Sequence, residues 1–169
     1  MKIVFLDIDG VLNSELSKGK LNNQYYELLR KLVEAADCYF VITSSWRCMT
    51  LDDTKWELSG HIAETNKKNK NRASRLQDPF PQWLLDRIVG ITPRAYYFIN
   101  YNTTRQYLCP RGTEIERFMN DTELVIDDYV IIDDDSDFMI YQKDKLIIVD
   151  SYTGLTENDI EKCINLFNQ

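Results

Sequence analysis

Two aspartates placed two residues apart, Asp7 and Asp9, are the first residues whose type and spacing could do chemistry. In an extended backbone, side chains two residues apart point to the same side, so these carboxylates would share one small space. Such a pair is costly unless a cation lies between the two groups or one of them takes a proton. Gly10 follows at once and allows a sharp turn and the close approach of a ligand. A plain strand end followed by a turn would have the same sequence, so the rest of the chain must supply the context.

A second acidic cluster follows a later apolar segment. Four of the five residues at positions 133–137 are aspartates, and they come directly after Tyr129-Val130-Ile131-Ile132. Packed together without a cation, these carboxylates would repel one another. The cluster therefore favours a bound cation rather than a purely structural role.

Hydroxyl groups end another apolar segment. Thr43 and Ser44 follow residues 38–42, and a helix is expected soon after them. Taken alone, such a pair is usually only a helix cap, but hydroxyls and the free N–H groups of a helix start also make a good phosphate receptor. Arg111 stands just before another expected helix start. His61 is the single histidine and lies in a polar setting, so we expect it to be exposed, and no histidine-based catalysis is evident.

The elements that must position these groups are predicted from apolar runs. Strands without polar alternation are typical of parallel sheets that are buried on both faces. An amphipathic helix over residues 21–36, with Asn22 or Asn23 as its cap, joins the first two strands in a unit that makes them parallel. Because the carboxyl ends of parallel strands meet at one edge, the acids and hydroxyls should converge there. The expected central strands are residues 3–6, 38–42, 129–132 and 145–149.

The other elements are less regular. Thr113 with Glu116, and Thr156 with Asp159, have the spacing of capping boxes at the starts of two helices. Residues 46–58 and 82–89 are expected to be helical, 90–93 to form a turn, and 96–99 to form a strand. The basic stretch that ends at Arg75 includes Lys67, Lys68, Lys70 and Arg72. It fits either a solvated surface loop or a basic edge that steers a polyanion toward the site.

Length and composition indicate one globular domain over residues 1–169, with room for a small insertion around residues 60–105. The net charge of −7 argues against a protein whose whole surface binds nucleic acid, although a local basic patch remains compatible with it. The four cysteines form no Cys-x-x-Cys pair, so we expect neither a zinc site nor a disulfide framework, and a cytoplasmic location. The N-terminal apolar run is too short for a signal peptide or a membrane span, and no membrane partner is expected.

The ordered set of motifs resembles the haloacid dehalogenase (HAD) superfamily of phosphoryl-transfer enzymes. Its first motif is matched by residues 5–11, its second by residues 41–44 and its fourth by residues 131–134. The third motif normally supplies a lysine; here Arg111 is the best-placed residue and Arg47 is its competitor. With their flanking residues included, the sequences of these motifs look like those of the HAD-like domain of Swiss Army Knife RNA repair proteins. The resemblance implies a Rossmann-like three-layer α/β sandwich with a mostly parallel central sheet and no large cap domain.

This resemblance implies a Mg²⁺-dependent phosphatase that acts through an aspartyl-phosphate. Asp7 would be the nucleophile and Asp9 the general acid and base, with Mg²⁺ held by Asp7, Asp133, Asp134 and the backbone carbonyl of Asp9. Whether Asp134 or Asp137 completes the metal shell stays open. Substrate oxygens would be held by four residues: Thr43, Ser44, Arg111 and, as the alternative cation, Arg47.

The absence of a large predicted cap suits a macromolecular substrate, such as the phosphorylated 3′ end of RNA or DNA. Exposed aromatic side chains could stack on its bases, and the candidates are Trp46, Trp83, Tyr96 and Tyr97. A phosphatase of nucleotides or small metabolites is the alternative. A receiver-like signalling domain also combines an aspartate, Mg²⁺, a hydroxyl and a cation, but it has its paired acids and its phosphorylated aspartate in the reverse order. A non-catalytic Mg²⁺-binding module would leave Asp9 without an evident task.

Overall fold

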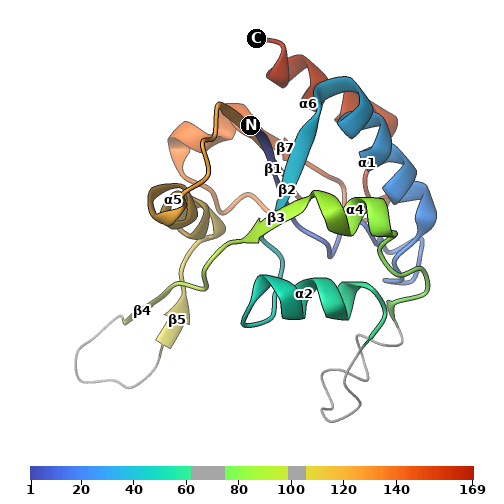
Figure 1. The fold of residues 1–169 in the computed structure, drawn as a ribbon, viewed down its shortest axis with the longest axis horizontal. Coiled ribbons are helices and arrows are strands. Elements are labelled where there is room, and N and C mark those ends of the chain that lie inside the picture. Colours follow the sequence, from blue (N-terminus) through green and yellow to red (C-terminus); the bar gives the residue numbers. More distant parts are fainter. Residues whose placement is uncertain (62–74, 99–105) are drawn as a thin grey trace.

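A computed structural model of the chain describes residues 1–61, 75–98 and 106–169 (Figure 1). Within them, one all-parallel sheet has the strand order β3-β2-β1-β6-β7, and β4 and β5 form a separate antiparallel pair. The sheet consists of β1 (Lys2–Leu6), β2 (Cys38–Ile42), β3 (Ile88–Ile91), β6 (Asp128–Asp133) and β7 (Leu146–Ile148). The pair consists of β4 (Tyr96–Phe98) and β5 (Gln106–Leu108).

Helices cover both faces of the sheet, which confirms the predicted three-layer α/β sandwich (Figure 1). On β1, Val4 and Leu6 pack into one core, while Ile3 and Phe5 pack into another on the opposite face. This explains why the strand is apolar at every position rather than at alternate ones. The first core includes residues from α1 (Asn23–Ala36), α2 (Leu51–Leu58), α4 (Gln82–Arg87) and α6 (Glu157–Phe167), and the second includes residues from α5 (Arg111–Asp121).

Helix starts follow the predicted caps in two cases and differ in one. The Asn22 side chain caps α1, and Thr156 and Asp159 form the reciprocal box of α6. The box predicted from Thr113 is wrong, because α5 begins earlier, at Arg111, after Pro110. Pro110 occupies the N-cap position of α5, and its side chain makes no capping hydrogen bond.

The turn predicted at residues 90–93 is wrong, because residues 88–91 form β3, which pairs with β2. A glycine within a short apolar run has the appearance of a turn in sequence, but here it serves close packing. A Cβ on Gly90 would lie 2.8 Å from the Phe118 ring of α5. Helix α2 is also shorter than predicted, since it starts at Leu51, and β7 lies at the edge of the sheet rather than at its centre.

The region expected to hold a small insertion contributes α4 and β3 to the main sheet and its helical layer. Among the described residues, the structure contains no helix with the length and apolar character of a membrane span. The four cysteines are free thiols.

Candidate active site

Three strands place their polar ends side by side at the carboxyl edge of the sheet. The backbone pairing continues one residue beyond β1 and β2: the Asp7 N–H donates to the Ile132 carbonyl at 3.0 Å, and the Thr43 N–H donates to the Leu6 carbonyl at 2.9 Å. Asp133 is the last residue of β6. Main-chain hydrogen bonds therefore fix the positions of Asp7, Thr43 and Asp133 relative to one another without the help of side-chain contacts.

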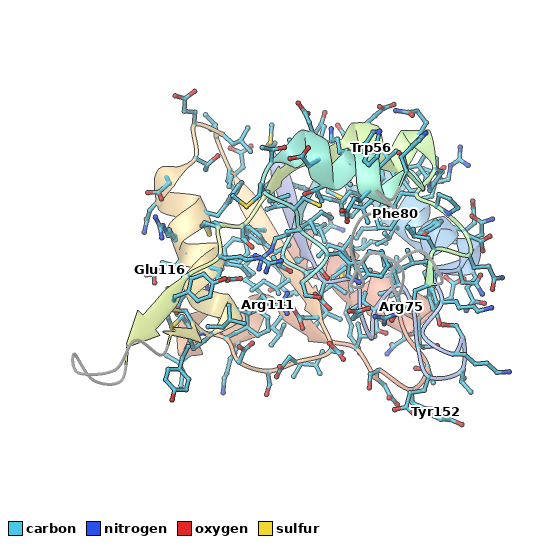
Figure 2. All side chains as sticks on the ribbon, turned by 90° about the horizontal axis from the view of Figure 1, so that it is seen from below. Trp56, Arg75, Phe80, Arg111, Glu116 and Tyr152 are labelled. Carbon is cyan, nitrogen blue, oxygen red and sulfur yellow. The ribbon has the colours of Figure 1, made fainter. Side chains whose placement is uncertain are left out.

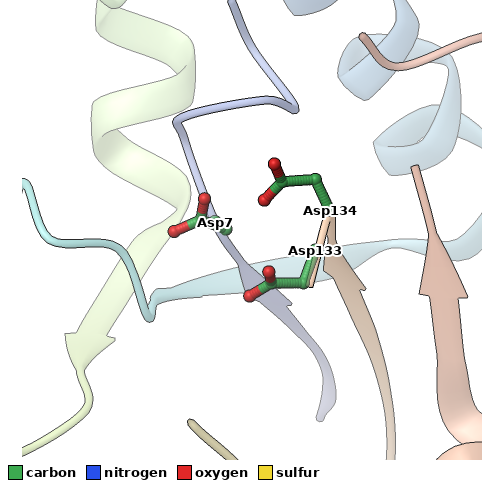
Figure 3. Close-up of side chains that lie close together, drawn as sticks. All are labelled: Asp7, Asp133 and Asp134. Carbon is green, nitrogen blue, oxygen red and sulfur yellow. The ribbon is translucent and has the colours of Figure 1, made fainter. Parts of the chain in front are cut away.

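Asp7, Asp133 and Asp134 form a compact acidic cluster (Figure 3). One carboxylate oxygen from each residue lies within 4.8 Å of the other two. Asp7 and Asp133 are buried, and within the described ranges Asp133 Oδ2 has no hydrogen-bond partner. Hard oxygen ligands that converge in this way, one of them an orphaned buried oxygen, fit a divalent cation such as Mg²⁺.

The protonation of this cluster reflects its burial. Burial raises the pKa of Asp7 to about 6, although Arg111 and a hydrogen bond from the Ser44 side chain oppose the shift. Burial, followed by repulsion from Asp7, raises the pKa of Asp133 to about 8. The pKa of Asp134 is also raised, chiefly by burial. Without a cation, the cluster therefore retains protons at pH values where ordinary aspartates are ionised.

Arg111 contacts the acidic cluster from the first turn of α5. Its Nη1 donates to Asp7 Oδ1 at 2.9 Å and also to the backbone carbonyl of Thr43, and its Nε lies 3.9 Å from Asp133 Oδ2. Burial lowers the pKa of this guanidinium, but the carboxylates of Asp7 and Asp133 outweigh that effect and raise it. Arg111 is thus a permanent positive charge beside the predicted nucleophile.

The backbone at the start of α5 fixes the position of Arg111. The Arg111 N–H donates to Asp137 Oδ2 at 3.0 Å, so that carboxylate caps the helix, and the acidic cluster contains Asp134 instead. Gly112 packs against the 3₁₀-helix η1 (Ile140–Lys145), and its carbonyl accepts from Gln142 Nε2 at 3.0 Å. A Cβ on Gly112 would lie 2.6 Å from the Met139 backbone nitrogen, so only glycine allows this contact.

Arg47, the competing cation, lies in a buried ion pair. Its Nη2 is 2.8 Å from Glu114 Oε2, and its Nη1 donates to the Thr92 carbonyl at 3.1 Å. Both charged side chains are less than a tenth exposed. Of the two candidate arginines, Arg111 contacts the acidic cluster. Arg47 instead pairs with Glu114 and so supports the first turn of α5.

The hydroxyl pair lies beside the cluster, but its surroundings differ from the prediction. The Ser44 side chain is close enough to Asp7 to oppose the rise in its pKa, whereas Thr43 Oγ1 is buried and has no partner among the described residues. The helix start expected directly after Ser44 is absent, since α2 begins only at Leu51. Phosphate binding from this strand would therefore depend on side chains and loop backbone.

Asp9 is not one of the three clustered carboxylates, and its side chain has other partners. Its Oδ1 accepts from Asn13 Nδ2 at 2.9 Å and from Arg75 Nη2 at 2.6 Å. The Asn13 side-chain oxygen in turn accepts from the Gly10 N–H at 2.9 Å. No role was predicted for Asn13, which lies two residues beyond the first motif, and Arg75 was predicted only as one member of a basic run.

Asp9, Arg75, Lys18 and Asp134 line an open pocket of about 430 Å³. The rest of its lining comes from Gly10, Asn13, Ser14, Glu15, Gly19 and Ser151. The four lysines and arginines at positions 67–72 lie outside the described residues, so the predicted basic edge is represented by Arg75 alone.

The predicted base-stacking aromatics are mostly placed elsewhere. Trp46 is buried and cannot offer a free ring face, and Trp83 packs against the core with Arg30 over its ring. Tyr96 is exposed on the β4–β5 pair, and the side chain of Tyr97 lies outside the described residues. Tyr152 was not predicted, yet its side chain is exposed and its residue is adjacent to Ser151 of the pocket wall (Figure 2).

Comparison with protein families matches residues 3–69 and 61–160 to the family described as the HAD domain in Swiss Army Knife RNA repair proteins. No match was found among curated proteins or among solved structures. The matched residues include both acidic motifs, Thr43 and Arg111, and they span most of the sequence. The chain therefore belongs to the HAD domains of Swiss Army Knife RNA repair proteins, and with them to the HAD-type phosphohydrolases.

Proposed function

We propose that this chain is a Mg²⁺-dependent phosphomonoesterase that removes phosphate from the ends of RNA or DNA through an aspartyl-phosphate on Asp7. The observation that carries the proposal is the convergence of Asp7, Asp133 and Asp134 beside the Arg111 guanidinium. A nucleophile, a cation site and a fixed positive charge at one sheet edge are what phosphoryl transfer requires. The fold alone would not support this choice, because many functions share it.

The three clustered carboxylates would hold the metal, with the Asp9 backbone carbonyl as a further predicted ligand. A bound Mg²⁺ would neutralise carboxylate charge and so let an anionic nucleophile approach an anionic phosphate. Asp134 is exposed and lines the pocket, so the cluster is reachable from solvent.

The side chains divide the reaction between them. An Asp7 oxygen forms a bond to phosphorus as the bond from phosphorus to the leaving oxygen breaks, and Asp9 gives that oxygen a proton. In the second step, Asp9 takes a proton from the water that attacks phosphorus, which frees Asp7 and releases phosphate. Arg111 and the hydroxyls of Thr43 and Ser44 would hold the transferring oxygens.

Two features favour a nucleic-acid end over a small metabolite. The pocket beside Asp9 is open and contains two cationic side chains, Lys18 and Arg75. Tyr152, next to Ser151 of the pocket wall, is 53% exposed. The Tyr152 carbonyl accepts a hydrogen bond from the N–H of Leu16, and the Leu16 side chain is also exposed, at 60%. An exposed tyrosine near a cationic pocket suits a base that stacks while its phosphates are held.

A reducing cytoplasm stays the predicted location.

The nucleophile is tested by Asp7→Asn. We expect Mg²⁺-dependent phosphate release to fall at least about a thousandfold, because an amide oxygen cannot form the covalent intermediate. The circular dichroism spectrum should stay unchanged, since the substitution conserves volume. Asp135→Asn changes a neighbouring exposed acid and serves as the control, with turnover close to that of the parent. Full activity of Asp7→Asn would refute the nucleophile assignment.

The substrate class is tested by comparing phosphate release from a 3′-phosphorylated oligonucleotide, free nucleotides and sugar phosphates, each with Mg²⁺ and with EDTA. We expect the oligonucleotide to have the highest kcat/KM and all activity to require the metal. Preference for free nucleotides would favour the metabolite alternative. A stable phosphoprotein without turnover would favour the receiver-like alternative.

A further inference from the structure

The pocket beside Asp9 has an arrangement of charges that the reaction itself does not require. Asp134 belongs to the acidic cluster and Asp9 to the first motif, whereas Lys18 comes from the loop after that motif and Arg75 from the segment before α4. Catalysis by Asp7, Asp9 and Arg111 explains neither cation. The volume of about 430 Å³ is sufficient for a small ligand rather than for a single ion.

Arg75 is anchored from several directions. Its Nη2 donates to Asp9 Oδ1 at 2.6 Å, its Nε donates to the Gly19 carbonyl at 3.0 Å, and its own carbonyl accepts from the Leu21 N–H at 2.9 Å. Its guanidinium also lies 5.8 Å from the centre of the Trp46 ring. A guanidinium has five N–H donors, so these contacts leave donors for an anion, and the side chain is 37% exposed.

The loop that carries Lys18 is held by its own hydrogen bonds. Ser14 and Ser17 bond reciprocally through backbone N–H and hydroxyl groups at 2.9 and 3.1 Å, and the Gly19 N–H donates to the Ser14 carbonyl at 2.8 Å. Lys18 itself has a φ of 56°, which is uncommon for a residue other than glycine. The ammonium group therefore extends from a constrained loop on the pocket wall. Glu15 on the same wall can accept a hydrogen bond from a sugar hydroxyl.

Resting on the proposed function, we propose that Arg75 and Lys18 form a second anion subsite that binds the phosphodiester next to the phosphate being removed. Asp9 protonates the leaving oxygen, so a guanidinium in contact with Asp9 lies on the leaving-group side of the reaction. In a 3′-phosphorylated strand, the leaving oxygen belongs to a ribose or deoxyribose that carries the next phosphate one sugar ring away. Arginine binds phosphate oxygens with two parallel hydrogen bonds, and lysine adds a point charge.

The subsite predicts a ranking of three substrates. With Mg²⁺, kcat/KM should be at least about tenfold higher for a nucleoside 3′,5′-bisphosphate and for a dinucleotide 3′-phosphate than for a nucleoside 3′-phosphate without a second anion. Arg75→Gln and Lys18→Gln should each reduce this ratio, and Arg75→Lys should retain part of it. Arg117→Gln removes a similar charge from an exposed arginine on α5 and should leave the ratio unchanged.

The ratio between substrates is the readout, because Arg75→Gln also removes a contact of Asp9 and can lower turnover on every substrate. Equal kcat/KM for the substrates with and without the second phosphate would overturn the subsite, as would a ratio that both substitutions leave intact. The proposed function fails differently, by an absence of Mg²⁺-dependent phosphate release from every nucleotide and oligonucleotide. In that event, calorimetric binding of the bisphosphate and the monophosphate to Asp7→Asn still tests the subsite: equal affinity refutes it, and weaker bisphosphate binding after Lys18→Gln supports it.

Discussion

Gly10 controls how closely two parts of the acidic cluster approach each other. Its φ is 78°, and a Cβ at this position would overlap the Asp134 carboxylate. The residue thus combines the left-handed conformation of the turn with a close approach that a side chain would block. This gives the glycine of the first motif a task in the proposed metal site besides its task in the turn.

We expect Gly10→Ala to displace the Asp134 carboxylate and to weaken Mg²⁺ affinity by at least about tenfold, as loss of a metal-orienting contact commonly does. Isothermal titration calorimetry with MgCl₂ measures the effect. Gly60→Ala is the control, because Gly60 also has a positive φ, of 97°, but among the described residues a Cβ there would approach only Pro79. Equal affinities of the two variants would show that Asp134 does not depend on this glycine.

Among the elements, α5 matters most for the site because its first turn carries Arg111. The buried carboxylate of Glu114 holds that turn in place, since its Oε2 pairs with Arg47 and its Oε1 accepts from the Ala95 N–H at 3.1 Å. Arg47 in turn bonds Thr92, which follows β3. One buried network therefore joins α5 to the segments that follow β2 and β3.

Removal of one partner should leave the other as an unpaired buried charge. We expect Arg47→Leu to lower the free energy of unfolding by about 3–5 kcal/mol in chemical denaturation. The double variant Arg47→Leu/Glu114→Leu should recover part of that loss. Arg117→Leu breaks an exposed pair with Asp121 on the same helix and should cost less than about 1 kcal/mol. If Arg47→Leu and Arg117→Leu lower the free energy of unfolding by similar amounts, the buried pair is not what anchors α5.

For the whole molecule, the acidic cluster makes stability depend on pH and on metal. Burial raises the pKa values of Asp7 and Asp133 to about 6 and about 8, from 3.8. Over this range the native state binds more protons than the unfolded state, so this contribution to stability is present at low pH and is lost as pH rises through the native pKa values. The metal-free protein thus retains the cost of its buried carboxylates at alkaline pH.

In EDTA, we expect Asp133→Asn to be more stable than the parent at pH 8 by at least about 1 kcal/mol and the difference to shrink toward pH 4. Mg²⁺ should reverse the order at pH 8, because it stabilises only the parent strongly. Urea denaturation at both pH values measures these differences, with Asp135→Asn as the control. A difference that does not vary with pH would contradict the assignment of the raised pKa to Asp133.

The sequence was sufficient for the frame of the site and insufficient for its contacts. Strands β1, β2 and β6 could be predicted because their apolar runs are continuous and each is closed by acidic or hydroxyl side chains that can take part in chemistry. Strand β3 could not, because Gly90 has the appearance of a turn until the packing of α5 is known. The same holds for the two arginines: Arg75 meets Asp9 across 66 residues, and only the docking of α5 assigns Arg47 to Glu114.

The strand order has a consequence for robustness. Because β1 lies in the middle of the sheet and β3 and β7 form its rims, fraying that starts at either rim must pass through β2 or β6 before it reaches the strand that carries Asp7. The proposed nucleophile thus follows the best-protected strand, while Lys18 and Arg75 are on loop and helix-flanking segments outside the sheet. Evolution could therefore alter which leaving group is accepted without disturbing the chemistry.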